Sequence, residues 1–113
     1  MIYEQCIVES LDMDIECDPV YAKVDELLDI LTKSKSLHIL LILHEASDSL
    51  SFSKLKSSVD SSGTTVSRRL SELEEYGLVE REVSESKSIS YKLTEKSESL
   101  APIIQSMYDW CQN

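Results

Sequence analysis

The chain has 113 residues, 42% of them hydrophobic, and 21 acidic against 11 basic side chains give it a formal net charge of −10. This length suits one domain with a single core, and the acidity excludes an evenly basic protein that coats nucleic acid. No apolar run approaches the ~20 residues of a membrane span, and the start lacks the features of a secretion signal. The three cysteines are an odd and widely spaced set, unlike a disulfide framework. We therefore expect a cytoplasmic protein with free thiols and no membrane partner.

The charges are unevenly distributed along the chain. Residues 1–30 contain nine acidic residues and one basic residue, whereas residues 31–92 contain nine of each. Within this balanced part, the segment 51–69 has one acidic residue against four basic ones, which are Lys54, Lys56, Arg68 and Arg69. A basic island of this kind suits local contact with phosphate. Ordinary scatter of charged residues is the alternative that the pattern leaves open.

The N-terminal part is predicted to be an acidic arm over residues 1–18, with a short strand near residues 7–8. Asp18 and Pro19 then suit the N-cap and the first turn of a helix. We predict this helix over residues 20–32, because apolar residues recur there at helical spacing. Its apolar positions are Val20, Val24, Leu27, Leu28 and Leu31.

Three further helices are predicted in the middle of the chain. Residues 37–43 are apolar on nearly every side, as expected of a central buried helix. Ser51 is a suitable N-cap for a short helix over residues 52–59, and a polar turn leads from it to a helix over residues 64–76. Gly77 fits a left-handed C-terminal cap. The last of these helices has one apolar face, formed by Val66, Leu70 and Leu73.

The periodicity changes after residue 77. Apolar and polar residues alternate on both sides of a polar turn at 84–87, which predicts a β-hairpin over residues 78–93. Thr94 can cap a last helical region whose apolar stripe lies within residues 100–111. Pro102 predicts a kink or a fresh start within that region, because proline lacks a backbone donor.

This order of elements predicts a mainly α-helical domain with a small β-hairpin wing, a winged helix-turn-helix, over residues 19–113. In such domains the second helix of the motif enters the major groove of double-stranded DNA with its N-terminal residues. Hydroxyl and guanidinium groups are suited to base edges and phosphates. The candidate DNA-binding residues are Ser62, Thr64, Thr65, Ser67, Arg68 and Arg69 at the recognition helix, Lys54 and Lys56 on the helix before it, and Arg81 and Lys87 on the wing.

Each candidate also has a structural interpretation. Arg68 and Arg69 can pair with Glu72 or Glu75 on the same helix, and the two threonines can serve only the helix start. Lys87 can be an ordinary solubilising residue. The whole module has a rival function as well, an acidic winged helix that binds protein and does not bind DNA by itself. The acids that favour this rival are those of the arm together with Glu72, Glu75, Glu80, Glu82 and Glu85.

Over residues 17–112 the sequence resembles the HxlR-type winged helix-turn-helix regulators, relatives of the MarR type. The resemblance is carried by residues 50–56, by the stretch Val-Ser-Arg-Arg-Leu-Ser-Glu-Leu-Glu-Glu-Tyr-Gly-Leu-Val-Glu-Arg at 66–81, by Tyr-Lys-Leu-Thr-Glu at 91–95 and by Leu-Ala-Pro with a late Trp110. It implies a cytoplasmic, homodimeric transcription regulator. Helices 20–32 and 99–111 are the expected dimerisation elements, unless their apolar stripes only complete the monomer core.

The sequence departs from this family at several points. Ser34-Lys35-Ser36 stands where the family usually has Gly-Lys-Trp, and Ser61-Ser62 replaces Ile-Ser. Cys17 lies near the family's Cys-Pro, which some members use for thiol sensing. It is a possible redox site, although the acids on either side disfavour the thiolate and favour an inert thiol.

No motif predicts an enzyme, a metal site or a cofactor. His38 and His44 are six residues apart and so point to different sides of one helix, which means that they cannot share a metal as an i, i+4 pair does. A glycine-rich phosphate loop and a nucleophile–base pair are both missing from the sequence. The residues do not identify a small-molecule effector.

Overall fold

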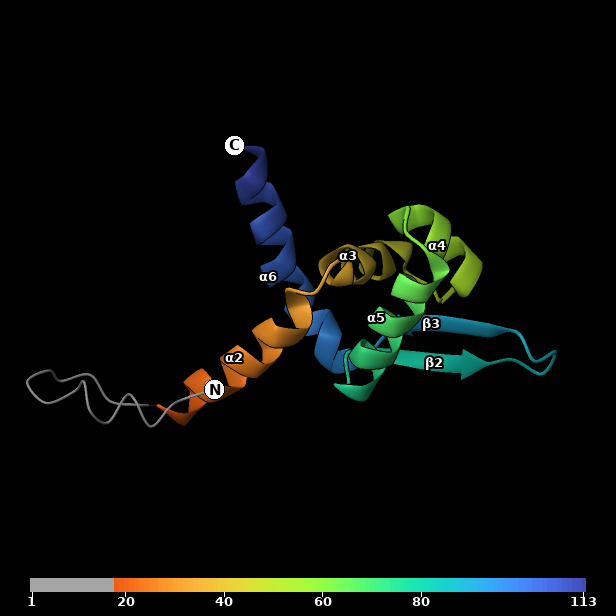
Figure 1. The fold of residues 1–113 in the computed structure, drawn as a ribbon, viewed down its shortest axis with the longest axis horizontal. Helices are drawn as coiled ribbons and strands as arrows, with labels where there is room; N and C mark the ends of the chain where they lie inside the picture. The colour runs from red at the N-terminus through yellow and green to blue at the C-terminus, as the bar shows by residue number, and fades with distance from the viewer. Residues whose placement is uncertain (1–17) are drawn as a thin grey trace, which may run out of the picture. The chain divides into compact units, whose positions relative to one another are not determined.

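The computed structural model describes residues 18–113, which fall into two compact units (Figure 1). One unit ends at Leu31 and the other covers Thr32–Asn113. The strand predicted near residues 7–8 and the thiol of Cys17 lie outside the described residues, as does the predicted arm apart from Asp18.

The described part of the first unit is helix α2, Pro19–Leu31. The Asp18 carboxylate accepts a hydrogen bond from the Val20 amide at 2.9 Å, and this confirms the predicted start of the helix. The helix begins and ends one residue earlier than the predicted span of 20–32. Its exposed large apolar side chains are Val20, Tyr21, Val24 and Leu28.

The second unit is a winged helix-turn-helix, which confirms the predicted fold class. Figure 1 shows α4 and α5 lying beside a β-hairpin that projects away from the helices. The elements are α3 (Ser36–Ala46), β1 (Leu50–Ser51), α4 (Phe52–Val59), α5 (Gly63–Glu75), β2 (Val79–Val83), β3 (Ile89–Leu93) and α6 (Glu95–Gln112).

The sheet has three antiparallel strands in the order β1-β3-β2, one more than the sequence analysis predicts. The missed strand, β1, has two residues and pairs Leu50 with Tyr91. Two residues are too few to display the alternation by which a strand is found in a sequence. The hairpin loop is also longer than the predicted turn, because the Ser84 amide bonds the Ser88 carbonyl at 2.9 Å and Lys87 takes a left-handed φ of 67°.

The core of the second unit includes the apolar faces predicted for α3 and α5. Helix α3 is buried at Ile39, Leu40 and Leu43, as expected of a central helix. The other buried apolar side chains are Leu55, Val59, Val66, Leu70, Leu73, Leu78, Val79, Leu93, Ala101 and Ile104. The hydroxyl of Ser36 is also buried, and it has no hydrogen-bond partner among the described residues.

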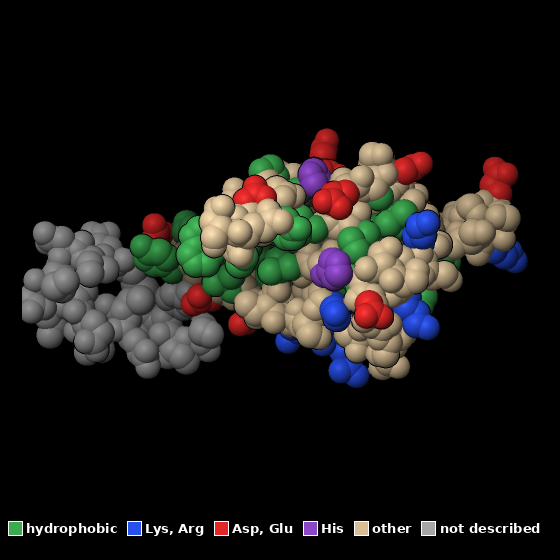
Figure 2. Space-filling view, turned by 90° about the horizontal axis from the view of Figure 1, so that it is seen from above, with side chains coloured by type: hydrophobic (Ala, Val, Ile, Leu, Met, Phe, Trp, Pro, Cys, Tyr) green, Lys and Arg blue, Asp and Glu red, His purple; other side chains and the backbone are tan. Residues whose placement is uncertain are grey.

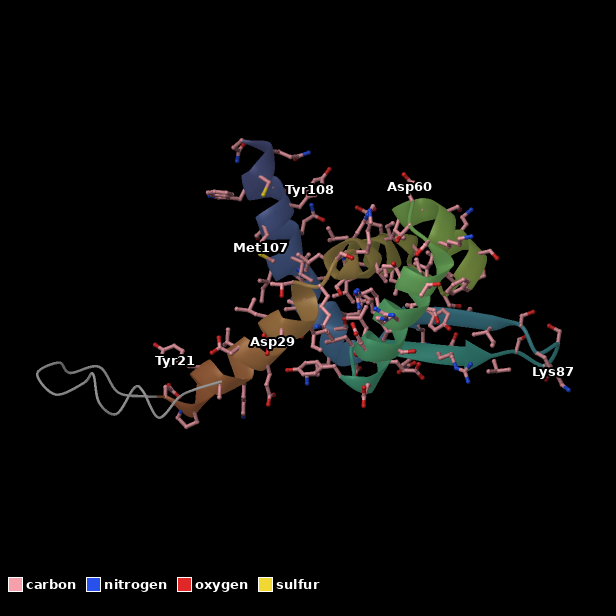
Figure 3. The ribbon with its side chains drawn as sticks, in the orientation of Figure 1. Tyr21, Asp29, Asp60, Lys87, Met107 and Tyr108 are labelled. Atoms are coloured by element: carbon pink, nitrogen blue, oxygen red, sulfur yellow. The ribbon has the colours of Figure 1, made fainter. Side chains whose placement is uncertain are left out.

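Helix α6 runs without interruption through Pro102, so the predicted fresh start is wrong. The Thr94 hydroxyl caps its first turn by accepting from the Ser97 amide at 3.2 Å. Burial of Ala101 and Ile104 on either side of Pro102 anchors the helix across the missing amide donor. The exposed apolar residues of α6 are Ile103, Met107, Tyr108 and Trp110, of which Met107 and Tyr108 are labelled in Figure 3.

Across residues 18–113, helices long and apolar enough to cross a membrane are absent.

Candidate nucleic-acid interface

The helix-turn-helix is built by two serine caps and a left-handed turn. Ser51 begins α4 by accepting a hydrogen bond from the Lys54 amide at 3.2 Å, and Asp60 ends it with a φ of 51°. Ser62 then begins α5 by accepting from the Thr65 amide at 3.2 Å, and its hydroxyl also donates to the Thr65 hydroxyl at 3.1 Å. These bonds satisfy amide groups at the helix start and fix where α5 begins.

Helix α5 separates a buried face from an exposed one. Val66, Leu70 and Leu73 are buried, whereas Thr64, Ser67 and Arg68 are exposed near the N-terminus. Thr65 is half-buried, in keeping with its role in the cap. Three predicted site residues thus share one accessible surface at the end of a helix whose amide dipoles favour anions.

Arg68 and Arg69 have different surroundings although they are adjacent. The Arg69 Nε donates to the Ser34 carbonyl at 2.9 Å, and its Nη1 lies 2.9 Å from the Glu72 carboxylate. The Arg69 side chain is only 13% exposed. Arg68 is exposed and has no hydrogen bond or ion pair within residues 18–113. The pairing considered for both arginines is therefore found for Arg69 with Glu72.

Lys54 and Lys56 are both exposed on α4. The stem of Lys56 lies along the start of α5, because its Cε and Cδ are 3.8 and 3.9 Å from the point where a Cβ on Gly63 would stand. Lys56 also lines an open hollow beside the turn, together with Ser53, Ser57 and Ser61. One predicted phosphate contact is thus brought next to the recognition helix.

The wing carries exposed Arg81 on β2 and exposed Lys87 in the loop, and Figure 3 shows Lys87 at the far end of the hairpin. Figure 2 shows Lys and Arg side chains mostly over the part of the molecule that holds the helix-turn-helix and the wing. Among the strand residues, Lys92 Nζ lies 3.0 Å from Glu82 and 3.9 Å from Glu80. The hydrogen bond with Glu82, together with the negative charges of both glutamates, raises the pKa of Lys92.

These ion pairs change the electrostatic balance of the surface. Of the five acids that disfavour phosphate near this face, Glu80 and Glu82 share Lys92 as a cationic partner, and Glu72 has Arg69. Glu75 and Glu85 have no cationic partner among the described residues. These acids therefore give weaker support to the rival function, an acidic module that binds protein.

The two histidines lie on α3, and His44 contacts α6. His44 Nδ1 lies 3.1 Å from the Glu98 carboxylate and joins α3 to α6. Within the described part of the chain, no three His, Cys, Asp or Glu side chains are grouped so that they could hold a metal ion.

Comparison with known proteins decides the family. The model of the HxlR-like helix-turn-helix family matches residues 31–113. The chain belongs to this family. The match covers α3 to α6 and therefore contains the whole interface described above. This confirms the resemblance seen in the sequence, while the roles of the individual site residues stay predictions.

Solved structures of transcription regulators share the fold of this HxlR-like chain. A possible HxlR family transcriptional factor from Thermoplasma volcanium GSS1 is 33% identical, with 77% of this chain and 83% of that chain covered and a TM-score of 0.63. The reduced form of the transcriptional regulator YodB from B. subtilis is 27% identical, with 78% and 87% covered and a TM-score of 0.69. The S. aureus MepR–DNA complex, 24% identical with 84% and 80% covered and a TM-score of 0.63, has the same fold. No curated protein sequence matches the chain.

Sequence reasoning missed one part of the interface, the contact between Arg69 and the carbonyl of Ser34. These residues are 35 positions apart in the chain. A backbone carbonyl as acceptor leaves no signal in the sequence, because every residue has one. The local signal was Glu72, which lies within one helical turn of both Arg68 and Arg69 and therefore did not indicate which of them has the internal partner.

Proposed function

We propose that this HxlR-like chain is a sequence-specific DNA-binding transcription regulator that acts as a homodimer. Helix α5 enters the major groove with Thr64, Ser67 and Arg68, and the β2–β3 wing lies on the backbone. The observation that carries the proposal is the exposed N-terminal face of α5, whose opposite face is buried in the core. An arginine in this position reads guanine, since its guanidinium spans two acceptors of that base.

The phosphate contacts proposed around this helix come from two sides. Lys54 and Lys56 act from α4, and Arg81 and Lys87 act from the wing. The Lys56 stem beside Gly63 supports this arrangement, because it brings a cation to the N-terminal end of α5. The DNA present in the solved MepR structure fits the proposal at the level of the fold.

The homodimer is proposed to form through α2 and α6. On α6, Ile103 is 59% and Trp110 is 77% exposed, so the apolar stripe does not merely complete the core of the second unit. Large apolar side chains left exposed along one element are typical of an interface. A two-fold dimer presents two recognition helices to half-sites about 34–36 Å apart, or a multiple of that spacing, which predicts a roughly palindromic operator.

The proposal is tested by selecting duplexes from a randomised pool with the full chain. We expect the wild type to recover a paired, roughly palindromic site that contains guanine. Arg68→Ala is expected to bind this site about 1–3 kcal/mol more weakly and to lose preference at one base position. Lys96→Ala is the matched control: it also removes one positive charge, but Lys96 lies 5.5 Å from the Tyr76 ring, beside the C-terminal end of α5.

The outcomes separate the proposed regulator from its rival. Equal binding by Arg68→Ala and wild type would contradict base reading by Arg68. Recovery of no duplex even at low salt would contradict the regulator function for the isolated chain. An acidic module that binds a basic protein would then be the better account.

A further inference from the structure

The connector between α2 and α3 depends on a side chain from the recognition helix. Three consecutive carbonyl groups in it have hydrogen-bond partners. The Lys33 carbonyl accepts from the Ser36 amide at 3.1 Å, and the Lys35 carbonyl accepts from the Ile39 amide at 2.9 Å. Between them, the Ser34 carbonyl accepts from Arg69 Nε on α5 at 2.9 Å. Loss of the Arg69 side chain would leave the Ser34 carbonyl without this donor, whereas the Lys33 and Lys35 carbonyls would keep their backbone donors.

The connector is also strained at this point. Lys35 has a φ of 73°, a left-handed conformation that a lysine adopts only when neighbouring contacts hold it. Those contacts are the two backbone bonds around Lys35 and the Arg69 bond to the preceding carbonyl. Ser36, which follows Lys35, is fully buried, so the connector is anchored in the core on one side and to α5 on the other.

Arg69 is held from both sides of its guanidinium. While Nε bonds Ser34, Nη1 bonds the Glu72 carboxylate at 2.9 Å, and the two side chains are 13% and 27% exposed. Two simultaneous bonds from one planar group fix both its position and its orientation. Movement of Arg69 to a phosphate would break both bonds and leave Glu72 partly buried without its cation.

We propose that Arg69 is a positioning residue, which together with Glu72 locks the recognition helix to the α2–α3 connector and does not contact DNA. This inference rests on the proposed DNA-binding function and refines it. Apolar packing of Val66, Leu70 and Leu73 holds α5 in the domain but is not directional. The hydrogen bonds of Arg69 are directional and fix the rotation of α5, and with it the direction in which Arg68 projects.

The sign of the effect of Glu72→Gln distinguishes positioning from charge. This substitution removes a negative charge from the recognition helix, so simple electrostatics predicts tighter binding of DNA. The positioning role predicts the opposite, about tenfold weaker binding of the duplex selected by the wild type, because a charge-assisted bond to Arg69 is lost. Arg69→Lys keeps the positive charge but cannot make both bonds, and it is expected to weaken binding to a similar extent.

The binding test uses the full chain, the selected duplex and a scrambled duplex of equal length. Binding is measured over a series of salt concentrations, at a temperature well below the Tm of each variant. We expect Arg69→Lys and Glu72→Gln to lose affinity for the selected duplex only, with an unchanged salt dependence. For Arg69→Ala, the plot of log K against log salt could become shallower by about 0.9 while Arg69→Lys binds almost as tightly as the wild type. That result would identify a phosphate contact and overturn the proposal. Tighter binding by Glu72→Gln, or a lower Tm with unchanged affinity, would overturn it too.

A second readout needs no DNA and separates this inference from the proposed function. Amide hydrogen exchange is compared at Ser36 and Ile39, which donate within the connector, and at Leu78, which donates to Leu73 elsewhere in the domain. Arg69→Lys is expected to speed exchange at the first two amides about tenfold and to leave Leu78 unchanged, whereas Arg68→Ala changes none of them. If the wild type selects no duplex, the proposed function fails. If Arg69→Lys leaves exchange at Ser36 and Ile39 unchanged, the positioning role is overturned, whatever the result of the selection.

Discussion

At the scale of single residues, the surroundings of a side chain decide its role more than its type does. Arg68 and Arg69 carry the same charge at adjacent positions, yet one is exposed and the other is tied to Ser34 and Glu72. The spacing to Glu72 indicated that an ion pair was available, but it did not indicate which arginine forms it. The choice follows from tertiary structure, because only Arg69 faces the connector.

The two glycines are expected to respond oppositely to substitution by alanine. Gly77 has a φ of 90°, so Gly77→Ala is expected to destabilise the protein by about 1–2 kcal/mol. Gly63 is the first residue of α5, and its added Cβ would meet Lys56 and Phe52 at ordinary distances of 3.8–3.9 Å. Gly63→Ala is therefore expected to stabilise by up to about 1 kcal/mol. Urea denaturation measures both, and a loss of stability in Gly63→Ala would contradict the packing described here.

Ser36 and Thr94 give a matched test of buried and capping hydroxyl groups. The Ser36 hydroxyl is buried without a partner in the described structure, so Ser36→Ala is expected to be neutral or to stabilise by up to about 1 kcal/mol. The Thr94 hydroxyl donates to the Gly77 carbonyl at 2.7 Å and accepts from the Ser97 amide, so Thr94→Ala is expected to cost about 1–2 kcal/mol. Thermal denaturation of both variants checks the contrast. Strong destabilisation by Ser36→Ala would mean that its hydroxyl has a partner.

At the scale of elements, the sequence predicted those segments whose signals are local. The span of α4 and the strand segments of the hairpin were predicted from a cap and from alternation, and the structure confirms them. Strand β1 was missed because its extended conformation comes from pairing with β3, where its partner Tyr91 is some 40 residues away in the chain. The fresh start predicted at Pro102 was wrong because tertiary packing of Ala101 and Ile104 outweighs one missing donor.

The wing contains an ion pair whose contribution to stability depends on pH. Bonding to Glu82 raises the pKa of Lys92 above its ordinary 10.5 in the folded state, so the stabilisation is complete below that value and is lost as pH rises through the higher folded pKa. Glu82→Gln is expected to lower stability slightly at neutral pH, since the pair is exposed and screened. In urea denaturation the difference from wild type should begin to shrink near pH 10.5 and disappear once the pH exceeds the higher folded pKa of Lys92. A difference that persists at higher pH would contradict this origin.

At the scale of the whole molecule, association is expected to cover the exposed apolar side chains of α6. Ile103→Glu places a charge on that stripe and is expected to dissociate the homodimer and to weaken operator binding more than tenfold. Gln105→Glu adds the same charge to α6 two positions away and is the control. Sedimentation velocity at micromolar concentration measures both. A dimer that survives Ile103→Glu would show that this stripe is not the interface.

The net charge of −10 and DNA binding are compatible because the charges are separated along the chain. Nine of the acids lie in residues 1–30, whereas the proposed interface has Lys54, Lys56, Arg68, Arg81 and Lys87 exposed. Binding then depends on the local field at the interface, which acts over a distance of about 8–10 Å at physiological salt. Composition alone would have suggested a protein that avoids nucleic acid.

The most direct test of DNA binding by this interface is a titration of the selected duplex with the wild-type chain at increasing salt concentration. We predict a linear fall of log K with log salt, with a slope of about −0.9 for each phosphate contacted, and a clear preference over a scrambled duplex. Removal of the Lys56 charge by Lys56→Ala should make this slope shallower by about 0.9. Affinity that is independent of salt and equal for the two duplexes would contradict the account.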